Sequence, residues 1–285
     1  MGFKSKLQEE LESELNEKKL DLLPSGFQTV GKVIIIKLKS ELLEKRKLIA
    51  DTYLKLLPYI RSVYINRGKI EGEYRTPEQI EYLAGEKDPI VLHKEHGVKY
   101  KFDITKIMFS QGNLKERKHL ASLVKNQEVI VDMFAGIGYF SLPMAVLSNP
   151  SRIFSIEFNP IAFRFLVENV KLNNVDKKVI PLHGDCKVEA PRLASQGIEA
   201  DRIVMGVFPA PKGYIEEALK LTKKSGTIIH YEGIVDGEHE LKLYNEFKNI
   251  AENSDIKTNL LDSRFIKSYG PNLYHCVNDI EISKN

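Results

Sequence analysis

The sequence has few of the residues that would indicate a disulfide framework, a zinc site or a membrane span. Its 285 residues include only two cysteines, Cys186 and Cys276, too few for a disulfide framework or a four-cysteine zinc site. Apolar runs such as 33–36 are far shorter than the ~20 residues of a membrane helix. The charged N-terminus has no apolar core of a signal peptide. We therefore expect a cytoplasmic protein in a reducing compartment.

The composition is that of an ordinary globular protein. Hydrophobic residues make up 42% of the chain and charged residues 28%, which excludes a collagen-like, mucin-like or disordered chain. The net charge of +3 permits a nucleic-acid partner without establishing one. The length suits roughly two domains, and we expect a small α+β domain at 1–105 and a larger domain at 106–285.

Local patterns predict the elements of the first domain. Leu7, Leu11 and Leu15 recur at four-residue spacing, which predicts an amphipathic helix. The expected elements are a helix at 5–20, a strand at 32–38, a helix at 40–57 with Ser40 as its N-cap, and short strands between 63 and 109 that include a hairpin around 95–97.

The pattern of apolar and polar residues changes after residue 110. Apolar runs of four to six residues alternate with helical stretches of ten to fifteen, which is the signature of βαβ units and a mostly parallel sheet. Two β-rich runs flank Gly270-Pro271-Asn272 and predict a C-terminal antiparallel hairpin. We therefore expect an α/β, Rossmann-like domain with the layout of class I methyltransferases.

The strongest local motif is the run V-D-M-F-A-G-I-G at 131–138, a buried strand that enters a tight glycine turn. Such turns bring the backbone close to a ligand at a helix N-terminus. The third glycine of a dinucleotide motif would fall at Ser141, and Asp132 stands four residues before the first glycine. This acidic loop favours the cationic sulfonium of S-adenosylmethionine over a pyrophosphate.

Two further acids end the next two predicted strands. Glu157 can accept both hydroxyls of a ribose, a device that NAD and S-adenosylmethionine sites share. Asp185, followed by Cys186, could accept the adenine amino group. Ligands of open α/β sheets bind at the carboxyl ends of the strands, so acids at successive strand ends predict a nucleotide site.

Taken together, the motifs resemble a known family. The segments FSQGNLKERKHLA, VDMFAGIGYFSLPMAV, IEFNP, LVENVKLN, HGD, DRIVMG and IIHYEG follow one another as in tRNA guanine-37 N1-methyltransferases and in the related wybutosine-synthesising aminocarboxypropyltransferases. GKIEGEYRTPEQIEYLAGE and HGVKYKFDITKIMFS look like their shared middle domain. The resemblance covers about residues 24–280.

Two departures distinguish the groups. The methyltransferases carry an Arg after Phe-Ser-Pro and an Asn-Leu-Pro after the fourth strand, whereas this chain has F-S-Q-G-N at 109–113 and G-V-F-P at 206–209. The resemblance therefore implies transfer of the 3-amino-3-carboxypropyl group to 4-demethylwyosine at position 37 of tRNA-Phe, a step towards wybutosine derivatives. The alternatives are a methyltransferase acting on guanosine or its wyosine derivative at this position, and an idle RNA-binding protein.

The resemblance also implies a set of site residues. The expected S-adenosylmethionine-binding residues are Ser110, Arg117, Asp132, Phe134, Ala135, Gly136, Gly138, Glu157, Asp185 and Cys186. Arg117 could pair with the methionine carboxylate. The sequence does not identify a general base, and neither a metal nor a membrane partner is expected of what would be a monomer. His230-Tyr231 is expected to end the fifth strand of this domain, and His230 reads as a structural histidine or a base. Asp201 reads as a cap or a partner of Arg202.

Binding of the tRNA anticodon loop requires basic and aromatic side chains. The candidates are Arg61, Arg67, Lys69, Arg75 and Lys267 for phosphates, and Tyr64, Tyr74 and Tyr269 for stacking.

Overall fold

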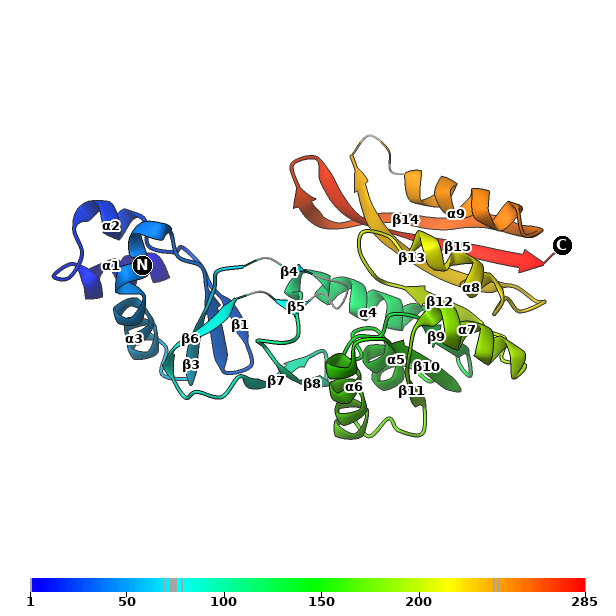
Figure 1. The fold of residues 1–285 in the computed structure, drawn as a ribbon, viewed down its shortest axis with the longest axis horizontal. Coiled ribbons are helices and arrows are strands. Elements are labelled where there is room, and N and C mark those ends of the chain that lie inside the picture. Colours follow the sequence, from blue (N-terminus) through cyan, green and yellow to red (C-terminus); the bar gives the residue numbers. More distant parts are fainter. Residues whose placement is uncertain are drawn as a thin grey trace. The chain divides into compact units, whose positions relative to one another are not determined.

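A computed structural model describes residues 2–68, 70–71, 76–77, 79–237, 239 and 241–284 (Figure 1). The chain divides into two compact units. Unit 1 comprises Met1–Lys94 and Lys99–Phe109, and unit 2 comprises Glu95–Val98 and Ser110–Asn285. The expected tRNA candidates Lys69, Tyr74 and Arg75 lie outside the described residues.

Unit 1 is built around a four-stranded sheet with the order β1-β2-β3-β6. Its strands are β1 (Gln28–Val30), β2 (Val33–Ile36), β3 (Ser62–Asn66) and β6 (Ile80–Gly85). The helices are α1 (Phe3–Leu11), α2 (Glu17–Asp21), the 3-10 helix η1 (Ser40–Lys45) and α3 (Arg46–Leu56). Two short pairs complete the unit: β4 (Ile70–Glu71) with β5 (Thr76–Pro77), and β7 (Ile90–Glu95) with β8 (Val98–Asp103), the expected hairpin.

The structure corrects two of the expected helices. The single helix predicted at 5–20 is two helices, because the Asn16 side chain accepts a hydrogen bond from Lys19 N and starts α2 anew. Leu7, Leu11 and Leu15 are all buried, as their spacing predicts. Ser40 is no N-cap: its hydroxyl donates to the Glu41 carboxylate, and α3 begins only at Arg46.

Unit 2 contains a seven-stranded sheet with the order β11-β10-β9-β12-β13-β15-β14. The strands are β9 (Val129–Asp132), β10 (Arg152–Glu157), β11 (Val179–His183), β12 (Arg202–Met205), β13 (Thr227–Asp236), β14 (Ile256–Gly270) and β15 (Leu273–Lys284). β9 to β13 pair in parallel, and β15 runs antiparallel to both β13 and β14. The predicted fold class and C-terminal hairpin are therefore confirmed.

Helices separate these strands along the chain. They are the 3-10 helix η2 (Gln111–Asn113), α4 (Leu114–Leu123), α5 (Ser141–Leu147), α6 (Pro160–Leu172), α7 (Cys186–Ser195), the 3-10 helix η3 (Lys212–Tyr214), α8 (Ile215–Leu219) and α9 (Lys242–Glu252). Among the described residues, no helix is both long and apolar enough to cross a membrane.

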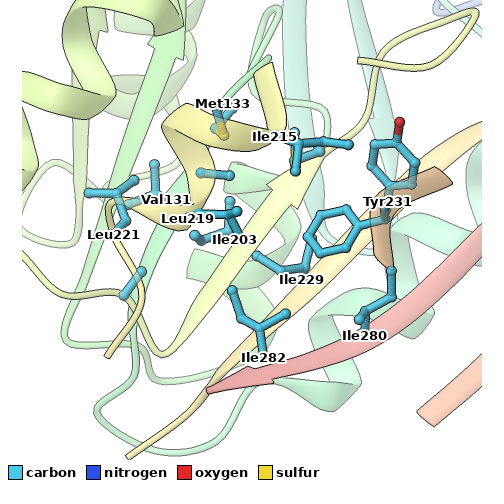
Figure 2. Packing of buried hydrophobic residues seen from close by; sticks show 14 of the residues in the cluster. Val131, Met133, Ile203, Ile215, Leu219, Leu221, Ile229, Tyr231, Ile280 and Ile282 are labelled. Carbon is cyan, nitrogen blue, oxygen red and sulfur yellow. The ribbon is translucent and has the colours of Figure 1, made fainter. Parts of the chain in front are cut away.

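The core of unit 2 follows from the apolar runs of its parallel strands. Val131, Ile203 and Ile229 are direct cross-strand partners on β9, β12 and β13, and all are fully buried. Figure 2 shows this row of side chains beside Leu219 of α8 and Ile282 of β15. Strands buried on both faces are continuously apolar, so the few charged residues within them have a specific reason to be there.

The core of unit 1 supplies a test of packing. Leu42 of η1 is fully buried in the apolar cluster around α1, α3 and β2. Truncation to alanine leaves a cavity, and we expect Leu42→Ala to lower the free energy of unfolding by about 2–5 kcal/mol. Urea unfolding measures this loss. Leu92→Ala is the control, because Leu92 is 48% exposed, and its effect should stay within about 0.5 kcal/mol; equal effects of the two variants would contradict the assignment of Leu42 to the core.

Candidate functional site

Four strand ends meet at one edge of the sheet in unit 2. Asp132 ends β9, and Ser155 of β10 and Val204 of β12 are its cross-strand partners. Glu157 ends β10 beside His183, the last residue of β11. This edge, at the carboxyl ends of β9 to β12, is where open α/β sheets bind ligands.

The glycine turn after β9 adopts the conformation that its sequence predicts. Gly136 and Gly138 have φ of +58° and +96°, values that favour glycine. A Cβ at Gly136 would lie 2.4 Å from the ring of Tyr139, and one at Gly138 would lie 2.6 Å from Leu142. The turn is also held to β10, because Ala135 N donates to Ile156 O over 2.9 Å. The turn therefore keeps this conformation and packing only while both glycines are present.

Asp132 stabilises the glycine turn through hydrogen bonds. Its Oδ2 accepts a hydrogen bond from Ser141 Oγ over 2.6 Å, and Ser141 in turn accepts from Ser155 Oγ over 2.7 Å. Complete burial raises the pKa of Asp132 to about 7, against the lowering effect of hydrogen bonds from Ser141 and Phe134 N, while Glu157 and Glu232 raise it further by their charge.

Glu157 is held in place by the backbone around it. Oε2 accepts from Gly136 N over 2.7 Å, and Oε1 accepts from Asn159 N over 2.6 Å. Burial raises the pKa of Glu157, and these backbone hydrogen bonds oppose the shift. A carboxylate has about four acceptor sites, so a half-buried Glu157 fixed in this way can still accept ribose hydroxyls.

Asn159 and Pro160 explain the orientation of the chain after Glu157. The Asn159 side chain accepts from Ile161 N over 2.9 Å, and Pro160 occupies the first turn of α6. Both are typical N-terminal helix residues.

Asp185 and Cys186 lie at the start of α7. Asp185 caps this helix by accepting from Lys187 N over 2.9 Å. Cys186 is buried, and its thiol donates to the carbonyl of Met133 in the glycine turn. Burial raises the pKa of the Cys186 thiol well above its usual value, so it is a neutral packing group. Phe134, half-buried, packs edge-to-face on Tyr214 with ring centroids 5.1 Å apart.

Ser110 and Arg117 form a second group. The Arg117 side chain is buried, forms a two-pronged ion pair with Glu95 and donates to the carbonyl of Ser110 over 3.1 Å. Ser110 Oγ accepts from Lys267 Nζ over 2.7 Å. The guanidinium that the sequence assigns to a methionine carboxylate is thus bound to a carboxylate of the protein, and Lys267 is the cation beside Ser110.

Two sequence-based interpretations need correction. β13 does not end at His230-Tyr231 but continues to Asp236, because β15 pairs with its whole length. Asp201 does not pair with Arg202: it accepts from Val129 N over 2.8 Å and forms an ion pair with Lys223.

His230 is structural. Arg202 Nη1 donates to its Nε2 over 2.6 Å, so the ring is neutral and its Nδ1–H donates to Asp279 over 2.5 Å. Burial lowers the pKa of His230 and Arg202 lowers it further, against the raising effect of Asp279.

The described tRNA candidates differ in their exposure. Tyr64 is 2% exposed and packs on Tyr82, so the prediction that it stacks on bases is wrong. Tyr269 is half exposed. Arg61 and Arg67 form ion pairs with Glu86, Asp88 and Glu81, which leaves their guanidinium groups partly neutralised.

Glu232 and His275 are not among the residues that the sequence motifs predicted for the site. Both are buried, and Glu232 Oε2 accepts from His275 Nε2 over 3.0 Å. An acid directly after the apolar run T-I-I-H-Y is the same signal that identified Asp132, Glu157 and Asp185, so Glu232 could have been found. Its histidine partner could not, because it lies 43 residues away on β15.

The raised pKa of Asp132 predicts a pH dependence of stability. Its pKa of about 7 in the folded state exceeds the 3.8 of an ordinary aspartate, so the folded state binds more protons in this interval and stability falls as the pH rises through it. Asparagine at position 132 does not titrate, so Asp132→Asn does not lose this stability as the pH rises. We expect the variant to gain about 1–4 kcal/mol relative to the wild type between pH 4 and pH 8.

Denaturant unfolding at pH 4 and pH 8 measures this gain. Asp176→Asn, at an exposed position, controls for the loss of a surface charge. If the free energies of unfolding of Asp132→Asn and the wild type differ by the same amount at both pH values, the raised pKa of Asp132 is contradicted.

Family models match both parts of the chain. The TRM5/TYW2 methyltransferase domain matches residues 91–259 and the TYW2 N-terminal domain matches residues 7–88.

Curated relatives and solved structures agree with these matches. The chain is 36% identical over 285 residues to a tRNA(Phe) (4-demethylwyosine(37)-C(7)) aminocarboxypropyltransferase of Pyrococcus horikoshii, covering 100% of this chain and 99% of the relative. A crystal structure of P. horikoshii TYW2 in complex with MeSAdo matches with a TM-score of 0.85 and 34% identity, over 99% of this chain and 100% of that one. A tRNA (guanine(37)-N(1))-methyltransferase Trm5b of Pyrococcus abyssi is 32% identical, over 92% of this chain and 76% of the relative. The resemblance seen in the motifs is thereby confirmed, and the chain belongs to the TRM5/TYW2 family.

Proposed function

We propose that this chain transfers the 3-amino-3-carboxypropyl group of S-adenosylmethionine to C7 of 4-demethylwyosine at position 37 of tRNA(Phe). The observation that carries the proposal is its match over the full chain to an aminocarboxypropyltransferase of that specificity. A second such enzyme, of Methanocaldococcus jannaschii, is 34% identical over 90% of this chain.

The glycines that replace the Arg and Asn of the methyltransferases support this choice. A Cβ at Gly112 would lie 2.7 Å from Cδ of Lys267, and a Cβ at Gly206 would lie 2.9 Å from the Phe140 ring. Neither position accepts a larger side chain unless its neighbour moves. The flexible Lys267 side chain can move away from Gly112, so Gly206, which lies against the Phe140 ring, is the position where a larger side chain would disturb the packing more.

The residues at the sheet edge fit S-adenosylmethionine. The glycine turn brings the backbone to the carboxyl edge of the sheet in a conformation that favours glycine, and its neighbouring acids match a cationic ligand. We assign the ribose to Glu157, the adenine to Asp185 and Cys186, and the remainder of the cradle to Asp132, Phe134, Ala135, Gly136 and Gly138. When bound, the sulfonium supplies an activated carbon, and orientation decides which of its carbons meets the base.

The second group would hold the methionine arm. Ser110 lies between Arg117, which binds its carbonyl, and Lys267, which binds its hydroxyl. We assign Arg117 a positioning role, because Glu95 occupies its guanidinium. We assign Lys267 to the methionine carboxylate, because its ammonium lies beside the Ser110 hydroxyl.

The wider setting is part of the proposal. Residues 1–105 would position the tRNA and residues 106–285 carry the reaction, in a cytoplasmic, monomeric enzyme without a metal ion. Both cysteines are free thiols, as in reducing compartments. Among the described residues, His119, Asp262 and Asp279 lie close enough to share a metal, but Arg264 forms ion pairs with both aspartates.

Glu157 provides a test of the cofactor site. Glu157→Gln replaces a charged acceptor by a neutral one of the same size, and we expect it to weaken S-adenosylmethionine binding about 10- to 100-fold. Isothermal titration calorimetry measures the change. Glu189→Gln is the matched control, since Glu189 pairs with Arg192 on α7; equal affinity of Glu157→Gln and the wild type would remove Glu157 from the site.

The transferred group is tested with S-adenosylmethionine labelled in either the methyl or the carboxyl carbon. We expect carboxyl label to enter tRNA-Phe that carries 4-demethylwyosine and not unmodified tRNA-Phe. Methyl label entering either tRNA would instead favour a methyltransferase, such as the 4-demethylwyosine(37)-methyltransferase Taw21 of Saccharolobus solfataricus, which is 33% identical over 90% of this chain. Tight tRNA binding with neither label transferred would indicate an idle RNA-binding protein.

A further inference from the structure

Glu232 is a buried carboxylate with one oxygen that has no hydrogen-bond partner in the part of the chain that the structure describes. Its residue is 1% exposed, and Oε2 accepts from His275 Nε2. Among the described residues, Oε1 of Glu232 has no hydrogen-bond partner, nor has Nδ1 of His275. A buried acceptor left unpaired costs about 1–3 kcal/mol, so such a group in a native site requires an explanation.

The unpaired oxygen faces the loop that follows β12. The parallel pairing of β12 with β13 ends at Met205 and Tyr231, so Glu232 lies directly beside Gly206. A Cβ at Gly206 would be 3.4 Å from Glu232 Oε1. The loop stays beside β13, because Ile234 N donates to Pro209 O over 3.1 Å.

The same loop borders the S-adenosylmethionine cradle. Gly206 lies against Phe140, which follows the glycine turn, and Met133 N of that turn donates to Val204 O over 3.0 Å. The negative charge of Glu232 also raises the pKa of Asp132. Glu232 therefore belongs to the site, on the side of the β12 loop.

We propose that Glu232 is a catalytic residue of this site: its Oε1 accepts the proton that the target base loses during group transfer, and His275 positions the carboxylate. The inference rests on the proposed function for the identity of the base.

The proton has to be accepted for the reaction to balance. C7 of the base forms its new bond to the aminocarboxypropyl carbon as the bond from that carbon to sulfur breaks, with the electron pair passing to sulfur. C7 then holds both its hydrogen and the new carbon, and the ring is cationic. Loss of the C7 proton to Glu232 Oε1 restores the neutral ring and leaves Glu232 as a carboxylic acid. General bases placed in this way contribute about 10²- to 10⁴-fold to a rate.

His275 suits the role of a positioning residue. With Glu232 ionised, His275 Nε2 carries the hydrogen and donates it to Oε2, which leaves Oε1 for the substrate. The Phe208 ring packs edge-on against His275 with centroids 4.6 Å apart. Phe208 belongs to the loop after β12, which borders the site, so this contact helps to fix the orientation of the histidine ring there.

The test compares Glu232→Gln, Glu232→Asp and the wild type in single turnover, at saturating S-adenosylmethionine and with tRNA-Phe carrying 4-demethylwyosine. We expect Glu232→Gln to lower the rate about 100-fold or more, while the dissociation constant for S-adenosylmethionine and the melting temperature stay close to the wild-type values. Glu232→Asp should recover part of the rate, because it restores a carboxylate although its shape fits less well than that of glutamine. His275→Gln, which can still donate to Oε2, should lose less than Glu232→Gln.

Glu246→Gln is the matched control. Glu246 accepts a hydrogen bond over 2.8 Å from the hydroxyl of Tyr231, the residue that precedes Glu232 on β13. Removal of the Glu246 charge should leave the rate unchanged. A Glu232→Gln rate within threefold of the wild type, or one above that of Glu232→Asp, would overturn the proposal.

The outcome for Glu232 is separable from that for the proposed function. If the wild type transfers methyl instead of carboxyl label, the proposed function fails, but the same variants still test Glu232 on the methyl transfer, since a guanine nitrogen also loses a proton when it is methylated. Transfer of neither label by the wild type would overturn both.

Discussion

The sheet of unit 2 depends on the buried ion pair and hydrogen bonds of Arg202. It is 1% exposed on β12 and forms a two-pronged ion pair with Glu128 at 2.8 and 3.0 Å. Its Nη2 also donates to Leu123 O, and its Nη1 donates to His230 Nε2. A buried guanidinium is tolerated only when its charge and its hydrogens are all matched, so these partners determine where the end of α4, β12 and β13 lie relative to one another.

The network continues beyond His230 to the antiparallel edge. His230 donates to Asp279 of β15, and Arg264 of β14 bridges Asp279 to Glu116 of α4. Although burial favours the neutral acid, hydrogen bonds from His230 and Arg264 and the charge of Arg264 outweigh it and hold the pKa of Asp279 well below its usual range. Four neighbouring strands and one helix are thus joined by charged side chains and by the neutral His230 ring between them. The carboxyl end of β12 and the start of its loop, where Gly206 meets Glu232, depend on this alignment.

Much of the site could be predicted because its signals are local. The glycine turn, Glu157 at the end of β10, and Asp185 at the start of α7 each lie within a few residues of the strand that positions them. The parallel sheet and the hairpin at 270–272 were also recognisable, because period, apolar runs and turn residues are properties of short segments. His230 was harder to interpret, since the same residue could serve a network or a substrate until its partners Arg202 and Asp279 were known.

Contiguous motifs are enough to identify the fold class, the glycine turn and the family. Which charged side chains form ion pairs within the protein depends instead on its three-dimensional packing. Arg117 meets Glu95 across 22 residues, Arg202 meets Glu128 across 74, and Glu232 meets His275 across 43. Tyr64 differs from the exposed Tyr269 only in its burial within the sheet of unit 1. Pairing and burial are set by the packing of distant segments, and no local pattern encodes them.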